Sequence, residues 1–405
     1  MPDTNEIVID RYELIREAFY NDALSRELDT RSFDEGNPRD GVLSTLHGDE
    51  HKERRRLENP LFRRSALVEY EQELFPDIVR AICGRHARGD VDLLELSGML
   101  AVVLAAKRAG VDHDGSREQL LELWYAGVNL AQAAALADVV EGREKIQREV
   151  METLARLRDR YVLPALEQRR ALLRSGDELP HDLVSAALLA RESGEIVLDD
   201  ELLTREVGLY LHGGSHTSAQ TTCNAFHFLL GYEQEARHDL LERAATSSLA
   251  AQQVVHETLR LKPMTPRVKR RATVDTTVGE LTIPAGTTVI MDVRAANRDE
   301  RLYGQHPERF DIDRRVDDKV QLWGLSFGAG AHICIGRSVA GGFPLHGGED
   351  DSDTSQAHLY GLVAHMVHAI AQHGVARHPS NDPELDTRTT RGSRWARFPV
   401  RFPTA

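Results

Sequence analysis

The residues most able to do chemistry gather in one short segment, 325–336, which reads LSFGAGAHICIG. Its single cysteine, Cys334, is surrounded by Gly328, Gly330 and Gly336. Glycine lets a backbone turn tightly and approach a flat ligand closely. Backbone N–H groups aimed at the sulfur would stabilise the thiolate, which is the form that binds metal. Because no second thiol or histidine lies at zinc-site spacing, the segment favours a metal whose other positions are filled, such as a heme iron. A glycine turn around an incidental cysteine is the alternative.

The full pattern of this segment, F-G-x-G-x-H-x-C-x-G, resembles the heme-binding loop of the cytochrome P450 family. The resemblance implies heme b as the cofactor and Cys334 as the axial iron ligand. It also implies that Phe327, Gly328, His332 and Gly336 shape or contact the cofactor site. Cys83 and Cys223 are then ordinary thiols, and no disulfide scaffold is expected.

Cations for the heme propionates are expected from two other segments as well as from His332. The resemblance places His51 and Arg55 in an early H-x-x-x-R element, and Arg270 at the start of the strand after the E-x-x-R helix. Arg271 is a second choice for the last position. Arginine is suited to this role because its guanidinium can pair with a carboxylate through two hydrogen bonds. A solvated basic helix face is the alternative for the first two residues.

The E-x-x-R element is Glu257–Arg260, in a helix that Ser247 or Ser248 would cap and Pro263 would end. Residues three apart share one helix face, so Glu257 and Arg260 can form an ion pair. The segment 296–314 is similar to the family's meander. There we expect Arg309 to complete a structural charge cluster with Glu257 and Arg260.

A long helix over 203–230 is expected to cross the oxygen side of the heme. Its Gly213, Gly214, Thr217 and Ser218 match the family pattern, which implies space for dioxygen at Gly214 and a hydroxyl that assists oxygen activation at Thr217. The usual acid is replaced by His216. Histidine titrates near neutral pH and can carry protons, so we expect His216 and Thr217 to form a proton relay. The alternatives are delivery by water, or a peroxide-driven or otherwise unusual reaction.

Two further departures concern the ends of the domain. The H-x-x-x-R element comes early, so we expect a shortened N-terminal sheet and first helix. The Gly-rich, acidic segment 341–355 should interrupt the helix after the cysteine loop at Ala340. It carries four acids, Glu349, Asp350, Asp351 and Asp353. Like charges there would weaken docking of an acidic ferredoxin; an inert surface insertion is the plainer interpretation.

Composition agrees with one globular domain. Of the 405 residues, 41% are hydrophobic and the net charge is −14, which disfavours nucleic-acid and anionic-membrane partners. The longest apolar run, Gly98–Ala106, is too short to span a membrane, which needs about 20 residues, and the N-terminus does not resemble a signal peptide. We expect a mostly α fold with small β-sheets (α+β) over residues 8–402, flexible ends at 1–7 and 403–405, helices over 118–136, 144–174 and 358–372, and a hairpin joining 281–284 to 287–292.

The resemblance implies a monomeric, cytoplasmic monooxygenase of secondary metabolism that activates O2 and oxidises a small, lipophilic molecule. Electrons would come from NAD(P)H through ferredoxin reductase and ferredoxin. The first alternative is a peroxide-driven or non-hydroxylating heme-thiolate enzyme, for example one that couples or isomerises its substrate. The second is a degenerate recruitment module. The identity of the substrate cannot be predicted from these motifs.

Overall fold

Helices make up most of the computed structural model, which describes residues 5–26, 39–133, 142–196, 198–232, 238–345, 358–387 and 394–404. The α-helices are α1 Tyr12–Tyr20, α2 Gly48–Glu58, α3 Arg64–Val68, α4 Phe75–His86, α5 Leu93–Ala109, α6 Arg117–Ala133, α7 Arg143–Leu157, α8 Leu163–Ser175, α9 Leu183–Ser193, α10 Asp200–Leu211, α11 Thr217–Leu229, α12 His238–Thr246, α13 Ser248–Leu261, α14 Val293–Ala296, α15 Glu300–Tyr303, α16 Arg337–Gly341 and α17 Leu362–Gln372. The 3-10 and π turns are η2 Asn59–Phe62, η3 Glu69–Leu74, η5 Arg158–Val162, η6 His212–His216 and η7 Gly330–His332.

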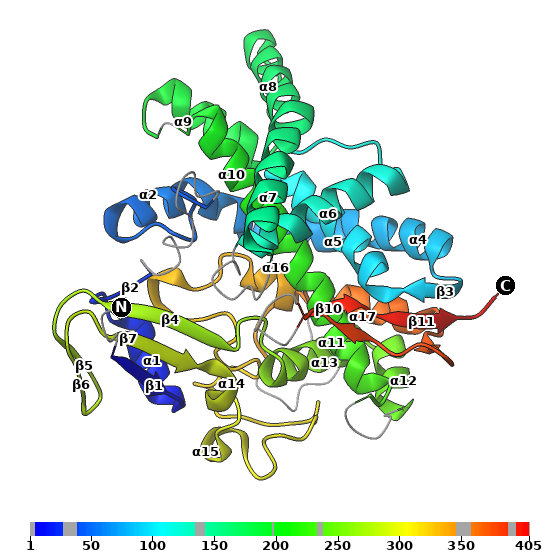
Figure 1. Ribbon diagram of the computed structural model, residues 1–405. Coiled ribbons are helices and arrows are strands. Elements are labelled where there is room, and N and C mark those ends of the chain that lie inside the picture. The colour runs from blue at the N-terminus through cyan, green and yellow to red at the C-terminus, as the bar shows by residue number, and fades with distance from the viewer. Residues whose placement is uncertain are drawn as a thin grey trace.

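The strands form four small sheets, and the largest has the order β1-β7-β4-β2. Figure 1 shows this sheet and α1 on one side of the molecule, and α4, α5 and α6 on the other. The strands are β1 Glu6–Ile9, β2 Leu24–Ser25, β3 Gly89–Asp92, β4 Arg267–Ala272, β5 Thr276–Val278, β6 Leu281–Ile283, β7 Thr288–Asp292, β8 Ala376–Arg377, β9 Glu384–Leu385, β10 Trp395–Arg397 and β11 Pro399–Phe402.

The predicted hairpin between 281–284 and 287–292 is wrong in its pairing, although both strands exist. β6 pairs with β5, in a register that places Leu281 opposite Val278. Only two residues separate these strands, which is the length of a tight hairpin loop. β7 instead lies between β1 and β4, parallel to the first and antiparallel to the second. The sheet therefore ties the N-terminal strand to the segment that carries Arg270.

The predicted long helix is present as α10, η6 and α11, which follow one another without a break. The π-helical turn η6 covers the segment HGGSH, where the family-like residues lie. A π turn inside an α-helix is often found at a functional site. α5 packs beside this helix, and its buried residues belong to the same large core cluster as those of α10, α11, α13 and α17. Packing of apolar faces therefore holds the helix in place.

Both ends of the domain differ in detail from expectation. β1 begins at Glu6, so the ordered domain starts before residue 8. α16 ends at Gly341, one residue beyond the predicted break. Residues 346–357, with Glu349, Asp350, Asp351 and Asp353, lie outside the described part of the chain. The two stems of this segment meet, because the Phe343 N–H donates to the Leu359 carbonyl at 2.8 Å.

The remaining helices agree with the predicted ranges. α6 covers the described part of 118–136, and α7, η5 and α8 together cover 144–174. α17, however, begins at Leu362 and not near His358, because Gly361 before it has a non-helical backbone, with φ +89° and ψ 155°. Within the described ranges, each helix is too short or too polar to span a membrane.

Candidate active site

Cys334 lies on a tight loop that the backbone itself holds closed. Its N–H donates to the Phe327 carbonyl at 2.9 Å, and the Gly328 N–H donates to the Leu325 carbonyl at 2.8 Å. Gly328 and Gly330 have φ values of +69° and +68°, which favour glycine. A Cβ on Gly330 would also lie 2.4 Å from the Phe19 carbonyl oxygen. The glycine spacing therefore shapes the loop as predicted.

Cys334 is an exposed residue, and protein atoms lie close around its thiol group. Desolvation raises the pKa of the Cys334 thiol, while the Gly336 N–H and the charges of Arg337 and Arg55 lower it. The predicted amide contribution comes from Gly336, whose backbone lies next to the sulfur. A metal ion at the exposed sulfur would complete the stabilisation of the thiolate.

Asn297, a residue that the sequence analysis did not select, anchors this loop to α13. Its side chain accepts from the Leu325 N–H at 2.8 Å and donates to the Ser326 hydroxyl at 3.0 Å and to the Arg260 carbonyl at 3.1 Å. The side chain is fully buried. The signal that could have found it is its place at the start of the segment 296–314. Asn297 therefore fixes the distance between the cysteine loop and the E-x-x-R helix.

The structural charge cluster forms as predicted except for its third side chain. Arg260 donates to both Glu257 carboxylate oxygens, at 2.6 and 2.7 Å, and all three charged side chains of the cluster are buried. The third is Arg314, whose Nε lies 3.2 Å from Glu257 Oε1. Ser247 caps the helix, since its hydroxyl accepts from the Ala250 N–H.

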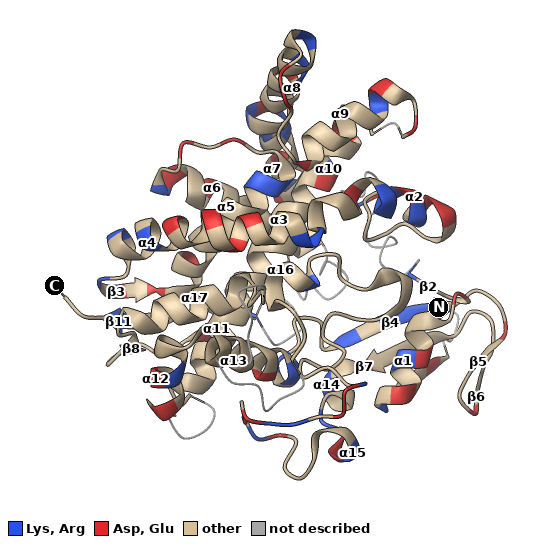
Figure 2. Ribbon diagram, turned by 180° about the vertical axis from the view of Figure 1, so that it is seen from behind, with Lys and Arg blue, Asp and Glu red and all other residues tan. Residues whose placement is uncertain are grey.

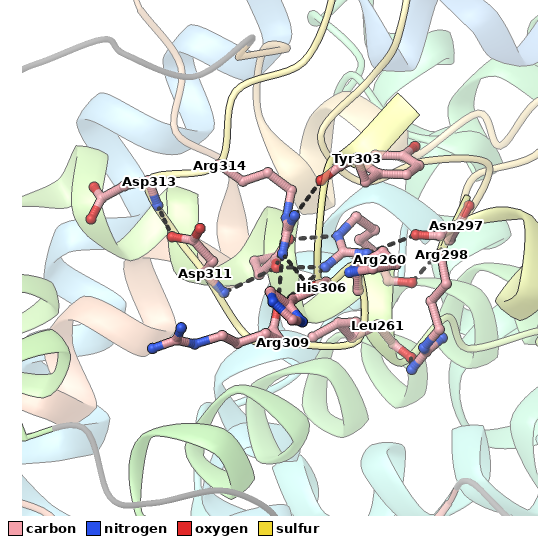
Figure 3. A network of polar contacts seen from close by, with 12 residues as sticks. Arg260, Leu261, Asn297, Arg298, Tyr303, His306, Arg309, Asp311, Asp313 and Arg314 are labelled. Carbon is pink, nitrogen blue, oxygen red and sulfur yellow. Dashed lines mark hydrogen bonds and ion pairs between the residues drawn. The ribbon is translucent and has the colours of Figure 1, made fainter. Parts of the chain in front are cut away.

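The prediction of Arg309 as the third member is wrong. Its side chain is exposed and, in Figure 3, extends away from the centre of the network, where Arg260 and Arg314 meet. Its contribution is its backbone carbonyl, which accepts from Arg314 at 2.9 Å and from Arg260 at 3.4 Å. The turns around Phe310 place the Arg314 side chain inside instead. The sequence pattern does not show which of the two arginines, Arg309 or Arg314, points into the cluster.

Basic side chains from three segments meet beside the cysteine loop. The ring centroids of His51 and His332 lie 4.2 Å apart, and those of His47 and His332 lie 5.2 Å apart. Burial, together with the positive charges of Arg26, His51, Arg270 and His47, lowers the pKa of His332 to about 3. Burial and the charges of Arg55, Arg26 and His47 lower the pKa of His51 to about 4.

Figure 2 shows Lys and Arg on α2, which carries His51 and Arg55, and on β4, which carries Arg270. The predicted residues His51, Arg55, Arg270 and His332 thus belong to one neighbourhood of basic side chains. Carboxylates placed there would offset the repulsion that, in addition to burial, depresses both histidine pKa values. The residues present fit a heme: Arg55 and Arg270, with the two histidines as further hydrogen-bond donors, would hold its propionates, and Cys334 would hold its iron.

On the oxygen-side helix the two glycines have different surroundings, and this changes the prediction. A Cβ on Gly214 would lie 3.1 Å from the Ala105 side chain of α5, so Gly214 allows helix packing. Gly213 is exposed and has open space where a Cβ would stand. The open space that was expected beside Gly214 therefore lies beside Gly213. Thr217 is partly exposed, and its hydroxyl donates to the Gly213 carbonyl at 2.6 Å.

His216 has a different environment from its neighbour Thr217. Its side chain is 4% exposed and stacks on Trp124 of α6, with 5.8 Å between ring centroids. The ring of His212 is 6.1 Å away. Ser218 is also buried and donates to the Gly214 carbonyl at 2.7 Å. The proposed relay of His216 and Thr217 stays a prediction.

Comparison with known proteins decides the family. The model of the family described as Cytochrome P450 matches residues 1–341. The chain belongs to the cytochrome P450 family. The crystal structure of CalO2 superposes with a TM-score of 0.76 at 22% identity, covering 98% of this chain and 90% of that one. Cytochrome P450 architecture therefore extends over nearly the whole chain, as a single domain with small sheets.

The curated relatives are P450 proteins at low identity. Putative cytochrome P450 137 of Mycobacterium tuberculosis is 33% identical over 184 residues, which are 45% of this chain and only 38% of that relative. Cyclooctat-9-en-7-ol 5-monooxygenase of Streptomyces melanosporofaciens is 28% identical over 359 residues, covering 81% of this chain and 75% of the relative. Erythromycin C-12 hydroxylase of Saccharopolyspora erythraea is 27% identical over 315 residues, 77% of this chain and 72% of the relative. Relatives named as a monooxygenase and a hydroxylase confirm the predicted enzyme class, an oxidoreductase.

Proposed function

We propose that this protein is a heme-thiolate monooxygenase that activates O2 and inserts one oxygen atom into a small, lipophilic organic molecule. The observation that supports it most is the placement of the exposed residue Cys334 beside the basic cluster of His51, Arg55, Arg270 and His332. Bound heme supplies the electron-transfer and dioxygen chemistry that protein side chains lack. The basic side chains would hold its propionates, and Cys334 would hold its iron.

The protein's own residues have three further roles in this proposal. Gly213 leaves the space in which a small molecule can approach the cofactor. Thr217 offers an oxygen lone pair to a donor there, because its own proton is engaged by the Gly213 carbonyl. Glu257, Arg260 and Arg314 hold the cysteine loop and the meander at a fixed distance.

The physiological setting is proposed from the family and from the names of relatives. Those names include oxidations of cyclooctat-9-en-7-ol and erythromycin, which favours an organic compound of bacterial secondary metabolism as substrate. Electrons would come from NAD(P)H through a reductase and a ferredoxin, and the protein would act as a monomer in the cytoplasm.

The test starts from ligands found by a spectral-shift screen of lipophilic compounds. Each binder is incubated with NADPH, ferredoxin reductase, ferredoxin and isotopically labelled O2. One labelled oxygen atom in the product supports the proposal, and unlabelled products or no products from every binder contradict it.

A peroxide-driven enzyme is the second candidate, because His216 occupies the place of the usual acid and is packed against Trp124. Equal turnover with hydrogen peroxide alone and with the ferredoxin system would favour this candidate.

A further inference from the structure

Two buried carboxyl groups lie between α2 and α10, outside the residues used so far. Arg54 and Glu58 are one helical turn apart on α2, and Glu206 and Tyr210 are one turn apart on α10. Arg54 pairs with Glu206 at 2.5 Å, and the Tyr210 hydroxyl lies 3.0 Å from Glu58 Oε2. The four side chains form two rungs of a ladder, which we call the α2–α10 ladder.

The ladder holds more acid than base. Glu58 and Glu206 are both 0% exposed. Glu206 is matched by Arg54 and also accepts from the Leu43 N–H, at 3.0 and 3.2 Å. Glu58 has no ion pair among the described residues, and its Oε1 has no hydrogen-bond partner there. An ionised carboxylate buried without a matched cation is costly, so such a group keeps its proton.

The electrostatic surroundings agree with this assignment. Burial raises the pKa of Glu58 well above its usual range, and the charge of Glu206 raises it further. Arg54 and Arg55 of α2, and the hydroxyl of Tyr210, act in the opposite direction but more weakly. Burial and both glutamates raise the pKa of Tyr210, and the charge of Arg108 of α5 lowers it more weakly. Burial raises the pKa of Glu206 as well, but the charge of Arg54 and the hydrogen bonds from Leu43 and Arg54 lower it, so Glu206 is the carboxyl group of the pair that ionises first.

The ladder lies next to the proposed heme site. The Tyr210 ring packs on Phe62 with 5.7 Å between centroids, and Phe62 reaches within 4.0 Å of where a Cβ on Gly336 would stand. Burial lowers the pKa of Arg55, and the charges of Cys334, Glu58 and Tyr210 raise it, so all three groups lie near this guanidinium. Tyr210 also precedes Gly213 by three residues, so it lies one turn from the open part of the oxygen-side helix.

Resting on the proposed monooxygenase function, we propose that Glu58 stores a proton for oxygen activation and releases it through Tyr210. At rest the Tyr210 hydroxyl donates to Glu58 Oε2. In the proposed step this hydroxyl turns toward the site and gives its proton to a water molecule there, while the Glu58 O–H bond breaks and its proton passes to the Tyr210 oxygen. Glu58 is left as a carboxylate near Arg54 and Arg55, and a proton from solvent restores it. This arrangement gives the protein an acid near the site although the usual acid position holds His216.

The stored proton is measured first, without any turnover. Infrared spectra of the purified holoprotein at pH 7 should contain the C=O band of a protonated carboxyl group. Glu58→Gln should lose this band. Glu53→Gln, a control at an exposed acid of the same helix, should keep it. Absence of the band in the wild type, or its persistence in Glu58→Gln, would overturn the proposal.

Release of the proton is measured next. The dithionite-reduced holoprotein is mixed with oxygenated buffer, and the return of the ferric spectrum is followed in H2O and in D2O. Because a positioned acid accelerates proton transfer by at least about 100-fold and water replaces it in part, we expect about a tenfold slower return in Glu58→Gln. Tyr210→Phe should keep the infrared band and show the same slow return. Glu53→Gln should match the wild type.

The outcomes distinguish failure of the proposed monooxygenase function from failure of the proposed role of the α2–α10 ladder. A wild-type protein that takes up no heme contradicts the proposed function itself. A wild-type protein with a thiolate-bound heme, whose Glu58→Gln and Tyr210→Phe variants return to the ferric form at the wild-type rate with the wild-type solvent isotope effect, contradicts only the role of the α2–α10 ladder.

Discussion

Arg314 provides the sharpest test of the charge cluster, because sequence and structure disagree about its role. Its guanidinium pairs with Glu257 and also donates to the carbonyls of Tyr303, His306 and Arg309. Arg314→Ala removes all of these contacts from a buried site. Arg309→Ala removes an exposed side chain and leaves the Arg309 carbonyl in place.

The expected loss can be estimated from the contacts. Removing one partner of a buried ion pair destabilises a protein by about 3–5 kcal/mol. The lower end applies here, since Glu257 keeps its two hydrogen bonds with Arg260. At about 2 °C for each kcal/mol in a chain of this size, the melting temperature should fall by about 6 °C. Arg309→Ala should stay within about 0.5 kcal/mol of the wild type, as exposed substitutions do.

The assay is thermal and urea unfolding of the purified holoproteins, followed by tryptophan fluorescence and by the heme spectrum. Arg314→Lys is a useful third variant, because it keeps the charge but not the planar fork of donors, and it should restore only part of the loss. Equal destabilisation by Arg309→Ala and Arg314→Ala would refute the assignment of the cluster.

Three other predictions concern the site. Gly330→Ala should sharply reduce heme content at purification, because its Cβ would meet the Phe19 carbonyl, whereas Gly115→Ala, with a similar φ but open surroundings, should keep its heme. Gly213→Ala should fold normally and slow carbon monoxide binding, because the new methyl group would enter open space. Gly214→Ala should lower stability, because its methyl group would crowd Ala105, and should bind carbon monoxide at the wild-type rate. The pKa of His51 is about 4 in the folded protein and 6.5 ordinarily, so between these pH values the unfolded chain binds the proton more readily. The free energy of unfolding of the heme-free protein should therefore fall as the pH is lowered from 6.5 toward 4. His51→Gln should show a smaller fall over that range than the wild type.

Much of the site could be predicted because its residues act through local spacing. The glycines around Cys334 shape one loop, and Glu257 and Arg260 are neighbours on one helix face. The long oxygen-side helix was expected from the family resemblance of the short motif within it. In each case the sequence separation is short, so helix and turn geometry determine the contact directly.

Contacts between distant elements could not be predicted in the same way. Arg314 replaces Arg309 because the turns of the meander orient its side chain, and no periodicity describes those turns. Glu58 and Tyr210 meet only because α2 packs near α10, 152 residues later in the chain. The pairing of β7 with β4 and β1 has the same cause. The different roles of Gly213 and Gly214 depend on which of them faces α5.

The carbon monoxide spectrum of the reduced holoprotein tests the central claim most directly, since it reports on the atom that binds the heme iron. We expect the thiolate-type Soret band in the wild type and its loss in Cys334→Ser, with Cys83→Ser and Cys223→Ser unchanged in band position wherever they fold. A wild-type spectrum without this band, or a Cys334→Ser variant that retains it, would contradict the assignment of Cys334 as the axial ligand.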